Sequence, residues 1–113
     1  MSLNITITPE SDNGKRISIA GSLDSNTAPQ LQQSIDAEID ESVDPTVIDF
    51  KDLDYISSAG LRVILKATKN LKNADGKLVL CAMQDYVKEV FEISGFDSFL
   101  PIVPTIDEAV KTI

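Results

Sequence analysis

Apolar and polar residues alternate with a period of two in the N-terminal part of the chain. Leu3, Ile5 and Ile7 are separated by Asn or Thr, and the same alternation returns over residues 15–20. This period is typical of strands that bury one face. The segment 11–14 between the two runs consists of turn-forming residues, so the pattern predicts an antiparallel β-hairpin.

A helical spacing follows the polar segment 21–27. The apolar residues that share one face of this predicted helix are Ala28, Leu31, Ile35 and Ile39. Thr27 and Gln30 stand at the spacing of a capping box, which indicates where the helix begins. Most other positions near its end are acidic and are predicted to form a solvated face.

The centre of the chain places a strand, a turn and a helix in direct succession. Residues 46–50 are rich in β-branched and aromatic side chains and predict a buried strand. Further apolar residues continue over 53–56 as the chain turns. From Leu61 onward the apolar residues repeat at helical spacing, so the helix is predicted to begin near Ser57 or Ser58.

The C-terminal part repeats the order of strand and helix. Strands are predicted at 77–82 and 99–103, and the helix between them is predicted to stop near residues 94–95. Thr105 and Glu108 form a second capping-box pattern before a terminal helix. The apolar positions of these helices are Met83, Val87, Val90 and Phe91 in one, and Ile106, Ala109, Val110 and Ile113 in the other.

Alternating strands and helices with short connections imply βαβ units with right-handed crossovers. The pattern therefore predicts an α/β fold with a mostly parallel sheet of about five strands, an antiparallel first strand and about four helices. The chain has 113 residues, 42% of them apolar and 25% charged. These values are typical of one globular domain, which we expect to span residues 1–113 without help from a disulfide or a metal.

The formal net charge of −8 restricts the partners that the chain can bind. Nucleic-acid backbones and anionic membranes need clustered Lys and Arg, so neither is expected as the main partner. A protein-binding module fits this charge better. No signal pattern and no apolar run of membrane-spanning length is present, so a cytoplasmic location is expected.

The chain contains one cysteine and no histidine. Cys81 lies within an apolar run and is predicted to be a buried free thiol. Without histidine the chain cannot form a Ser-His triad, a Cys-His pair or an imidazole metal site. We expect no enzymatic activity, no cofactor and no metal.

The serine pair at the central turn is the candidate site. Ser57 or Ser58 can cap the helix, and the backbone N–H groups there can also hold an anion such as a phosphate on the serine itself. Gly60 costs a helix roughly 1 kcal/mol relative to Ala, so a close approach of another group is expected at this position.

The segment DLDYISSAGLRVIL resembles the signature of STAS domains, specifically the anti-sigma factor antagonists of the sporulation and general-stress type. That signature follows a strand with Asp-Ser-Ser/Thr-Gly-Leu and a helix, and its first serine accepts a phosphate. The resemblance assigns this role to Ser58 and matches Gly60 and Leu61. This chain has Ser57 in place of the Asp and Ala59 in place of the second Ser/Thr, and Ser57 remains a rival acceptor.

The turn before the first helix resembles a second signature of the same family through Gly21, Leu23, Asp24 and Thr27. In the family this aspartate lies beside the phosphoserine turn and faces the kinase; the alternative is an ordinary Asx turn. The resemblance implies a STAS-type β/α superhelix. It also implies a partner-binding surface made of Asp24, Ser25, Asn26, Ser57, Ser58, Ala59, Gly60, Leu61 and Arg62.

The resemblance further implies a partner switch that regulates transcription. The unmodified protein, a monomer or weak dimer, would bind a serine-kinase anti-sigma factor, and phosphorylation of Ser58 would release it. A PP2C-type phosphatase would restore the unmodified form. Arg62 could pair with the phosphate or could simply be an exposed residue.

Two other functions are compatible with the sequence. The chain could be a STAS scaffold in a transport or other regulatory complex, with Ser58 as a helix cap only. It could also be an enzyme that uses Ser58 as a nucleophile, but the missing histidine leaves that serine without an evident base.

Overall fold

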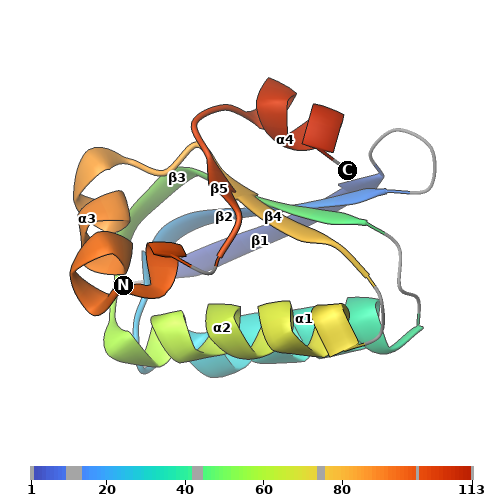
Figure 1. Ribbon diagram of the computed structural model, residues 1–113. Helices are drawn as coiled ribbons and strands as arrows, with labels where there is room; N and C mark the ends of the chain where they lie inside the picture. The colour runs from blue at the N-terminus through green and yellow to red at the C-terminus, as the bar shows by residue number, and fades with distance from the viewer. Residues whose placement is uncertain (1, 10–13, 42–44, 74–75, 99, 113) are drawn as a thin grey trace.

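The computed structural model describes residues 2–9, 14–41, 45–73, 76–98 and 100–112. Its elements, which Figure 1 shows, follow the predicted order of strands and helices. They are β1 (Leu3–Pro9), β2 (Lys15–Leu23), α1 (Ala28–Glu41), β3 (Thr46–Ile56), α2 (Ser58–Asn73), β4 (Leu78–Cys81), α3 (Asp85–Ser94), a 3-10 turn (Phe96–Ser98), β5 (Ile102–Val103) and α4 (Ile106–Thr112).

The strands form one five-stranded sheet in the order β1-β2-β3-β4-β5. β1 runs antiparallel to β2, with Ile5 opposite Ile19, and the other neighbouring strands are parallel. The predicted α/β fold with an antiparallel first strand is thus confirmed, as is the pairing of the first two strands. Residues 11–13 of the predicted turn lie outside the described residues.

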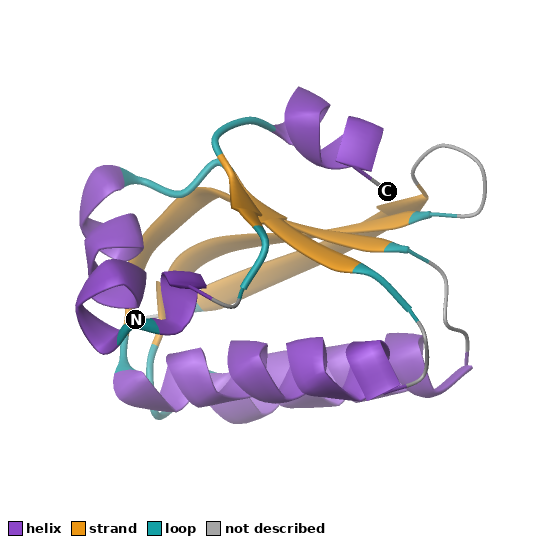
Figure 2. Cartoon of the chain, in the orientation of Figure 1, coloured by secondary structure: helices purple, strands orange, loops and turns teal. Residues whose placement is uncertain are grey.

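The helices form layers on both faces of the sheet. α1 and α2 lie side by side on one face, α4 lies on the other, and α3 stands at one end of the sheet (Figures 1 and 2). Between the sheet and α1 and α2 lies the main core, which includes the fully buried Ile17, Leu31, Ile48 and Ile64. The apolar faces predicted for α1 and α2 therefore do meet the sheet. The side chain of Ile39 and residue Ile113 lie outside the described part.

A smaller apolar cluster lies between the sheet and α4, and α3 is anchored separately. The cluster consists of Val47, Val79, Cys81 and Ala109. Phe91 of α3 packs edge-on against Phe50 of β3, with ring centroids 5.9 Å apart and an interplanar angle of 87°. This contact holds α3 against β3, the central strand in the order of the sheet.

β3 is longer than predicted, because it continues beyond residue 50 to Ile56. Its buried residues Phe50, Leu53 and Ile56 are spaced by three, which breaks the expected alternation. The pairing with β2 accounts for this spacing: between Ser18 and Ala20, and again between Gly21 and Ser22, β3 contains one residue more than β2. Such bulges keep the apolar side chains on the core side and carry the strand to the serine turn.

β5 is shorter than predicted and comprises only Ile102 and Val103. It pairs with Leu80 and Cys81 of β4. Pro101 has no backbone N–H, so it cannot donate to the neighbouring strand, which limits the pairing on that side. Residue 99, part of the predicted strand, lies outside the described residues.

Candidate functional site

Two turns meet at the carboxyl ends of neighbouring parallel strands. One turn connects β2 to α1, and the other connects β3 to α2 (Figure 1). The backbone N–H of Ser57 donates a hydrogen bond to the carbonyl oxygen of Leu23 over 2.9 Å. The structure therefore brings together the two segments that the sequence singled out, at the edge where open α/β sheets usually carry their sites.

Asp24 forms an Asx turn. Its Oδ1 atom accepts hydrogen bonds from the backbone N–H groups of Asn26 and Thr27, over 2.9 and 3.1 Å. The Thr27 hydroxyl donates to the carbonyl oxygen of Ser22 over 2.8 Å. Asp24 thus shapes the turn before α1, in agreement with the Asx-turn interpretation.

The predicted capping box of Thr27 and Gln30 is wrong. The Gln30 side chain donates to the carbonyl oxygen of Leu3 over 3.0 Å instead of reaching back to Thr27. In a capping box the Gln30 side chain would accept a hydrogen bond from the Thr27 N–H. That N–H already donates to Asp24. The second predicted box is confirmed in one half, since the Thr105 hydroxyl accepts a hydrogen bond from the Glu108 N–H over 3.2 Å.

The two serines have different environments. Ser57 precedes α2 and is half-buried; its Oγ accepts a hydrogen bond from the Gly60 N–H over 3.4 Å, and its carbonyl accepts one from Leu61 over 3.0 Å. Ser58 is the first residue of α2, and its side chain is exposed. The capping role therefore belongs to Ser57, which leaves the Ser58 hydroxyl as the accessible one.

Gly60 explains how closely the two turns pack. A Cβ atom at this position would lie 2.6 Å from Cγ of Leu23 and 3.1 Å from Cγ1 of Ile56. Both distances are shorter than an ordinary van der Waals contact. The predicted close approach at Gly60 is confirmed, and the neighbour is the end of β2.

The residues predicted to bind a partner differ in exposure. Those exposed are Ser25, Asn26, Ser58 and Arg62; those half-buried are Asp24, Ser57 and Ala59; those buried are Gly60 and Leu61. Side-chain contacts from this surface would come from the first two groups. Gly60 and Leu61 are buried beneath the turn and contribute to its packing.

Tyr55 is a candidate that the sequence reasoning missed. It lies in β3 two residues before Ser57, opposite Ser22 of β2, and 49% of it is exposed. An exposed aromatic ring beside a site is a common contact residue in protein interfaces. No pattern in the sequence separates it from the buried Leu53 and Ile56, because its exposure depends on the bulges opposite β2.

Cys81 is buried, as predicted. Burial, and to a lesser extent the charge of Asp49, raise the pKa of its thiol from 9.0 to about 12, although Arg16 acts in the opposite direction. The thiol also lies 3.6 Å from the carbonyl oxygen of Ile48. Because the thiolate is the reactive form, this thiol is unsuited to chemistry at neutral pH.

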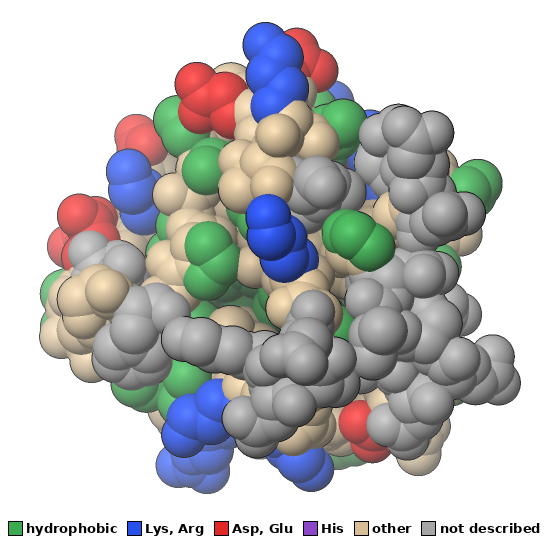
Figure 3. All heavy atoms as spheres, turned by 45° about the vertical axis from the view of Figure 1, so that its right-hand side comes forward, with side chains coloured by type: hydrophobic (Ala, Val, Ile, Leu, Met, Phe, Trp, Pro, Cys, Tyr) green, Lys and Arg blue, Asp and Glu red, His purple; other side chains and the backbone are tan. Residues whose placement is uncertain are grey.

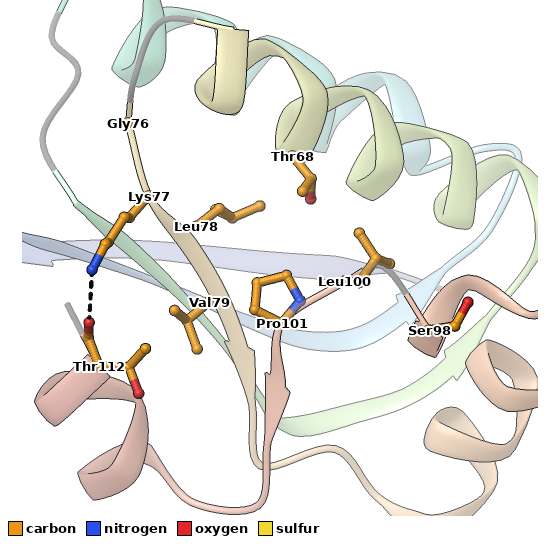
Figure 4. Close-up of a pocket in the computed structure, with 9 residues that line it drawn as sticks. All are labelled: Thr68, Gly76, Lys77, Leu78, Val79, Ser98, Leu100, Pro101 and Thr112. Atoms are coloured by element: carbon orange, nitrogen blue, oxygen red, sulfur yellow. Dashed lines mark hydrogen bonds between the residues drawn. The ribbon is translucent and has the colours of Figure 1, made fainter.

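A hollow of about 490 Å³ lies away from the two turns, between α2, the start of β4 and the end of α4. Figure 4 shows Thr68, Leu78 and Leu100 around it, and Lys77 donating a hydrogen bond to the carbonyl oxygen of Thr112 over 3.3 Å. Figure 3 shows one face of the surface, on which hydrophobic side chains lie among charged side chains of both signs. No predicted site residue lines this hollow.

The described residues contain no group of three or more Cys, Asp and Glu side chains placed to hold a metal ion. No helix within the same residues is long and apolar enough to cross a membrane. The site thus consists of the two turns, with an exposed serine at the start of α2.

A mixed sheet with an antiparallel first strand, and a serine turn at the carboxyl end of a parallel strand, are the features of a STAS domain. The chain belongs to the STAS domain family, which it matches over residues 6–109. The family resemblance found in the motif around Ser58 is therefore confirmed.

Individual relatives agree with this assignment. The chain is 46% identical to BtrV of Bordetella bronchiseptica, named as a candidate anti-sigma factor antagonist, over 84 residues that cover 74% of this chain and 72% of BtrV. It is 29% identical to the anti-sigma-B factor antagonist of Listeria monocytogenes over 103 residues, 90% of each protein. The crystal structure of an anti-sigma factor antagonist from Mycobacterium paratuberculosis is similar with a TM-score of 0.91 and 25% identity, covering 99% of this chain and 94% of that one.

Proposed function

We propose that this protein is an anti-sigma factor antagonist that works as a phosphorylation-controlled partner switch. The observation that carries the proposal is the exposed Ser58 at the start of α2, beside a Ser57 that already caps the helix. The names of its relatives support the same class of function. The unmodified protein would bind a serine-kinase anti-sigma factor through the two turns and so free the sigma factor.

Phosphorylation of Ser58 would end this association by electrostatic repulsion. A phosphate adds about −1.5 to −2 charges at neutral pH. Asp24 carries a negative charge on the adjacent turn, and like charges in a desolvated contact are strongly unfavourable. The N-terminus of α2 can accommodate the phosphate locally, so the fold itself need not change.

The remaining parts of the switch are proposed on the same basis. A single domain of residues 1–113 would act in the cytoplasm as a monomer or weak dimer. A PP2C-type phosphatase would remove the phosphate and return the protein to its binding form.

The experiment that tests this proposal combines capture with phosphorylation. Immobilised unmodified protein is incubated with a lysate of its source cell, then with ATP and Mg²⁺, and its intact mass is measured. We expect a kinase-like partner, one phosphate gained, and release of that partner. A partner from a membrane transport complex, with no gain in mass, would contradict the switch and favour the scaffold function.

Two variants identify the acceptor. Ser58→Ala should bind the partner but gain no phosphate, because its hydroxyl is missing. Ser57→Ala is the matched control: it should still be phosphorylated, although loss of the cap should lower the free energy of unfolding by about 1 kcal/mol. If Ser58→Ala still gained the phosphate, the assignment of the acceptor would be wrong.

A further inference from the structure

The exposed face of α2 carries a row of positive charges that begins one helical turn after Ser58. The row consists of Arg62, Lys66 and Lys69, all exposed. At 100° per residue these residues and Ser58 fall within an arc of about 80° on the helix, opposite the buried Leu61, Ile64 and Leu71. They extend over about 16 Å at a rise of 1.5 Å per residue.

This cationic row is unusual within an acidic protein. The sequence of α2, SAGLRVILKATKNLKN, contains no Asp or Glu, whereas the whole chain has 18 acidic and 10 basic residues. In the part of the chain that the structure describes, Arg62, Lys66 and Lys69 form no ion pair. Their charges are therefore not neutralised within the described fold and are available to another molecule.

We propose that this row, Arg62, Lys66 and Lys69, is a docking surface for a carboxylate-rich face of the anti-sigma factor partner. The inference rests on the proposed function, because it extends the contact from the Ser58 turn along α2. Charge complementarity is the argument: three aligned cations fit carboxylates spaced about one helical turn apart. Such complementary charges accelerate association and fix how the partner is oriented.

A protein partner fits the row better than a polyanion does. Three cations attract locally, but a nucleic acid or an anionic membrane extends far beyond them and would meet the repulsion of a protein with net charge −8. A folded acidic surface of limited size avoids that repulsion. The row would also orient the partner, because the partner's carboxylates would lie along α2 on the C-terminal side of Ser58.

The position of Arg62 connects the row to phosphorylation. Ser58 and Arg62 are four residues apart on the helix, the spacing at which an anion followed by a cation pairs most favourably. A phosphate on Ser58 would attract the Arg62 guanidinium and would repel carboxylates that lie near it. Phosphorylation would therefore weaken the first position of the docking surface as well as add charge at the turn.

The test compares two charge reversals of equal size. The dissociation constant for the anti-sigma factor, captured as above and then purified, is measured by calorimetry for the parent protein. It is measured again for the double variant Lys66→Glu/Lys69→Glu and for the control Lys88→Glu/Lys111→Glu, whose lysines are exposed on α3 and α4. We expect binding at least about tenfold weaker for the α2 variant and within about twofold for the control, because only close charges act strongly.

Salt provides an independent readout. Binding of the parent should weaken as ionic strength rises, and the α2 variant should lose much of this dependence. Circular dichroism of each variant checks that the fold is intact.

The outcomes separate this inference from the proposed function. If the parent binds and is released on phosphorylation, but both double variants weaken binding equally, the docking surface is overturned and the switch stands. If the parent binds no anti-sigma factor, the switch itself fails, and the docking surface with it. If the α2 variant binds the partner as tightly as the parent does but no longer binds a DNA duplex or anionic lipid vesicles, the row binds a polyanion and the proposed docking surface is overturned.

Discussion

Ser57 and Ser58 are chemically identical neighbours that the fold makes different. The residue just before a helix can accept a hydrogen bond from the first helical turn, and Ser57 does so from the Gly60 N–H. The next side chain along points outward, and Ser58 is exposed. One residue of displacement therefore separates a structural hydroxyl from an accessible one.

Gly60→Ala should destabilise the protein by up to about 2 kcal/mol. Alanine favours a helix by about 1 kcal/mol over glycine, but the added Cβ would lie 2.6 Å from Leu23. Leu23 is fully buried, so it can shift only by disturbing its packed neighbours, and overpacking, which typically costs about 1–3 kcal/mol, should outweigh the gain. Urea unfolding followed by circular dichroism measures the difference.

Asn70→Ala provides the control for this prediction. Asn70 is exposed on the same helix, so only the helix propensity changes and the protein should become slightly more stable. If Gly60→Ala were as stabilising as Asn70→Ala, the close contact with Leu23 could not be important.

At the scale of the element, β4 is protected by its neighbours on both sides. It pairs with β3 and β5, and all of its residues are buried.

The thiol of Cys81 in β4 links the stability of the protein to pH, because burial raises the pKa of this thiol to about 12. Below the unfolded pKa of 9.0 the thiol is protonated in both states, so its ionisation does not affect stability there. As pH rises from that value towards 12, only the unfolded state loses the proton, and stability falls.

Alkylation of Cys81 at about pH 8 should therefore be slow in the folded protein and fast after unfolding in urea. Mass spectrometry after timed exposure to iodoacetamide gives both rates. Labelling that is as fast in buffer as in urea would mean that β4 opens readily and that the thiol is not buried in solution.

The lengths of the strands were the least predictable feature at this scale. Strand 46–50 was recognised by composition, but its continuation to Ile56 depends on bulges opposite β2 that no local pattern reveals. β5 is short because Pro101 has no backbone N–H to donate to a neighbouring strand. This effect depends on which strand lies beside Pro101, and the tertiary fold decides that. In contrast, α2 was predicted well because its apolar positions repeat over several turns.

For the whole molecule, Ser58→Asp should separate binding from folding. An acidic residue in the first helical turn interacts favourably with the helix dipole, by about 0.3–1 kcal/mol, so the free energy of unfolding should stay within about 1 kcal/mol of the parent. Binding to the anti-sigma factor should nevertheless weaken, since the new charge lies at the proposed contact. Urea unfolding and calorimetry on the same preparation measure both quantities.

Ser25→Asp is the matched control, because Ser25 is exposed on the neighbouring turn and carries the same change of charge. It should also weaken binding, but it should not block phosphorylation at Ser58. A large loss of stability in Ser58→Asp, parallel to its loss of affinity, would mean that the switch acts by unfolding.

The sequence alone determined the class of fold, the order of the elements, the buried thiol and the turn that carries the candidate site. These follow from local periodicity, turn residues and one short motif, all of which are properties of neighbouring positions. The tertiary structure decided which serine caps the helix, how closely Gly60 packs against Leu23, that Asp24 forms an Asx turn, and that three cations share the exposed face of α2. The physical reason is that exposure and close contact depend on segments far apart in the chain, which meet only when the sheet is formed. The Asx turn and the Ser57 cap are local hydrogen bonds, but the residue types alone left open which side chain forms them.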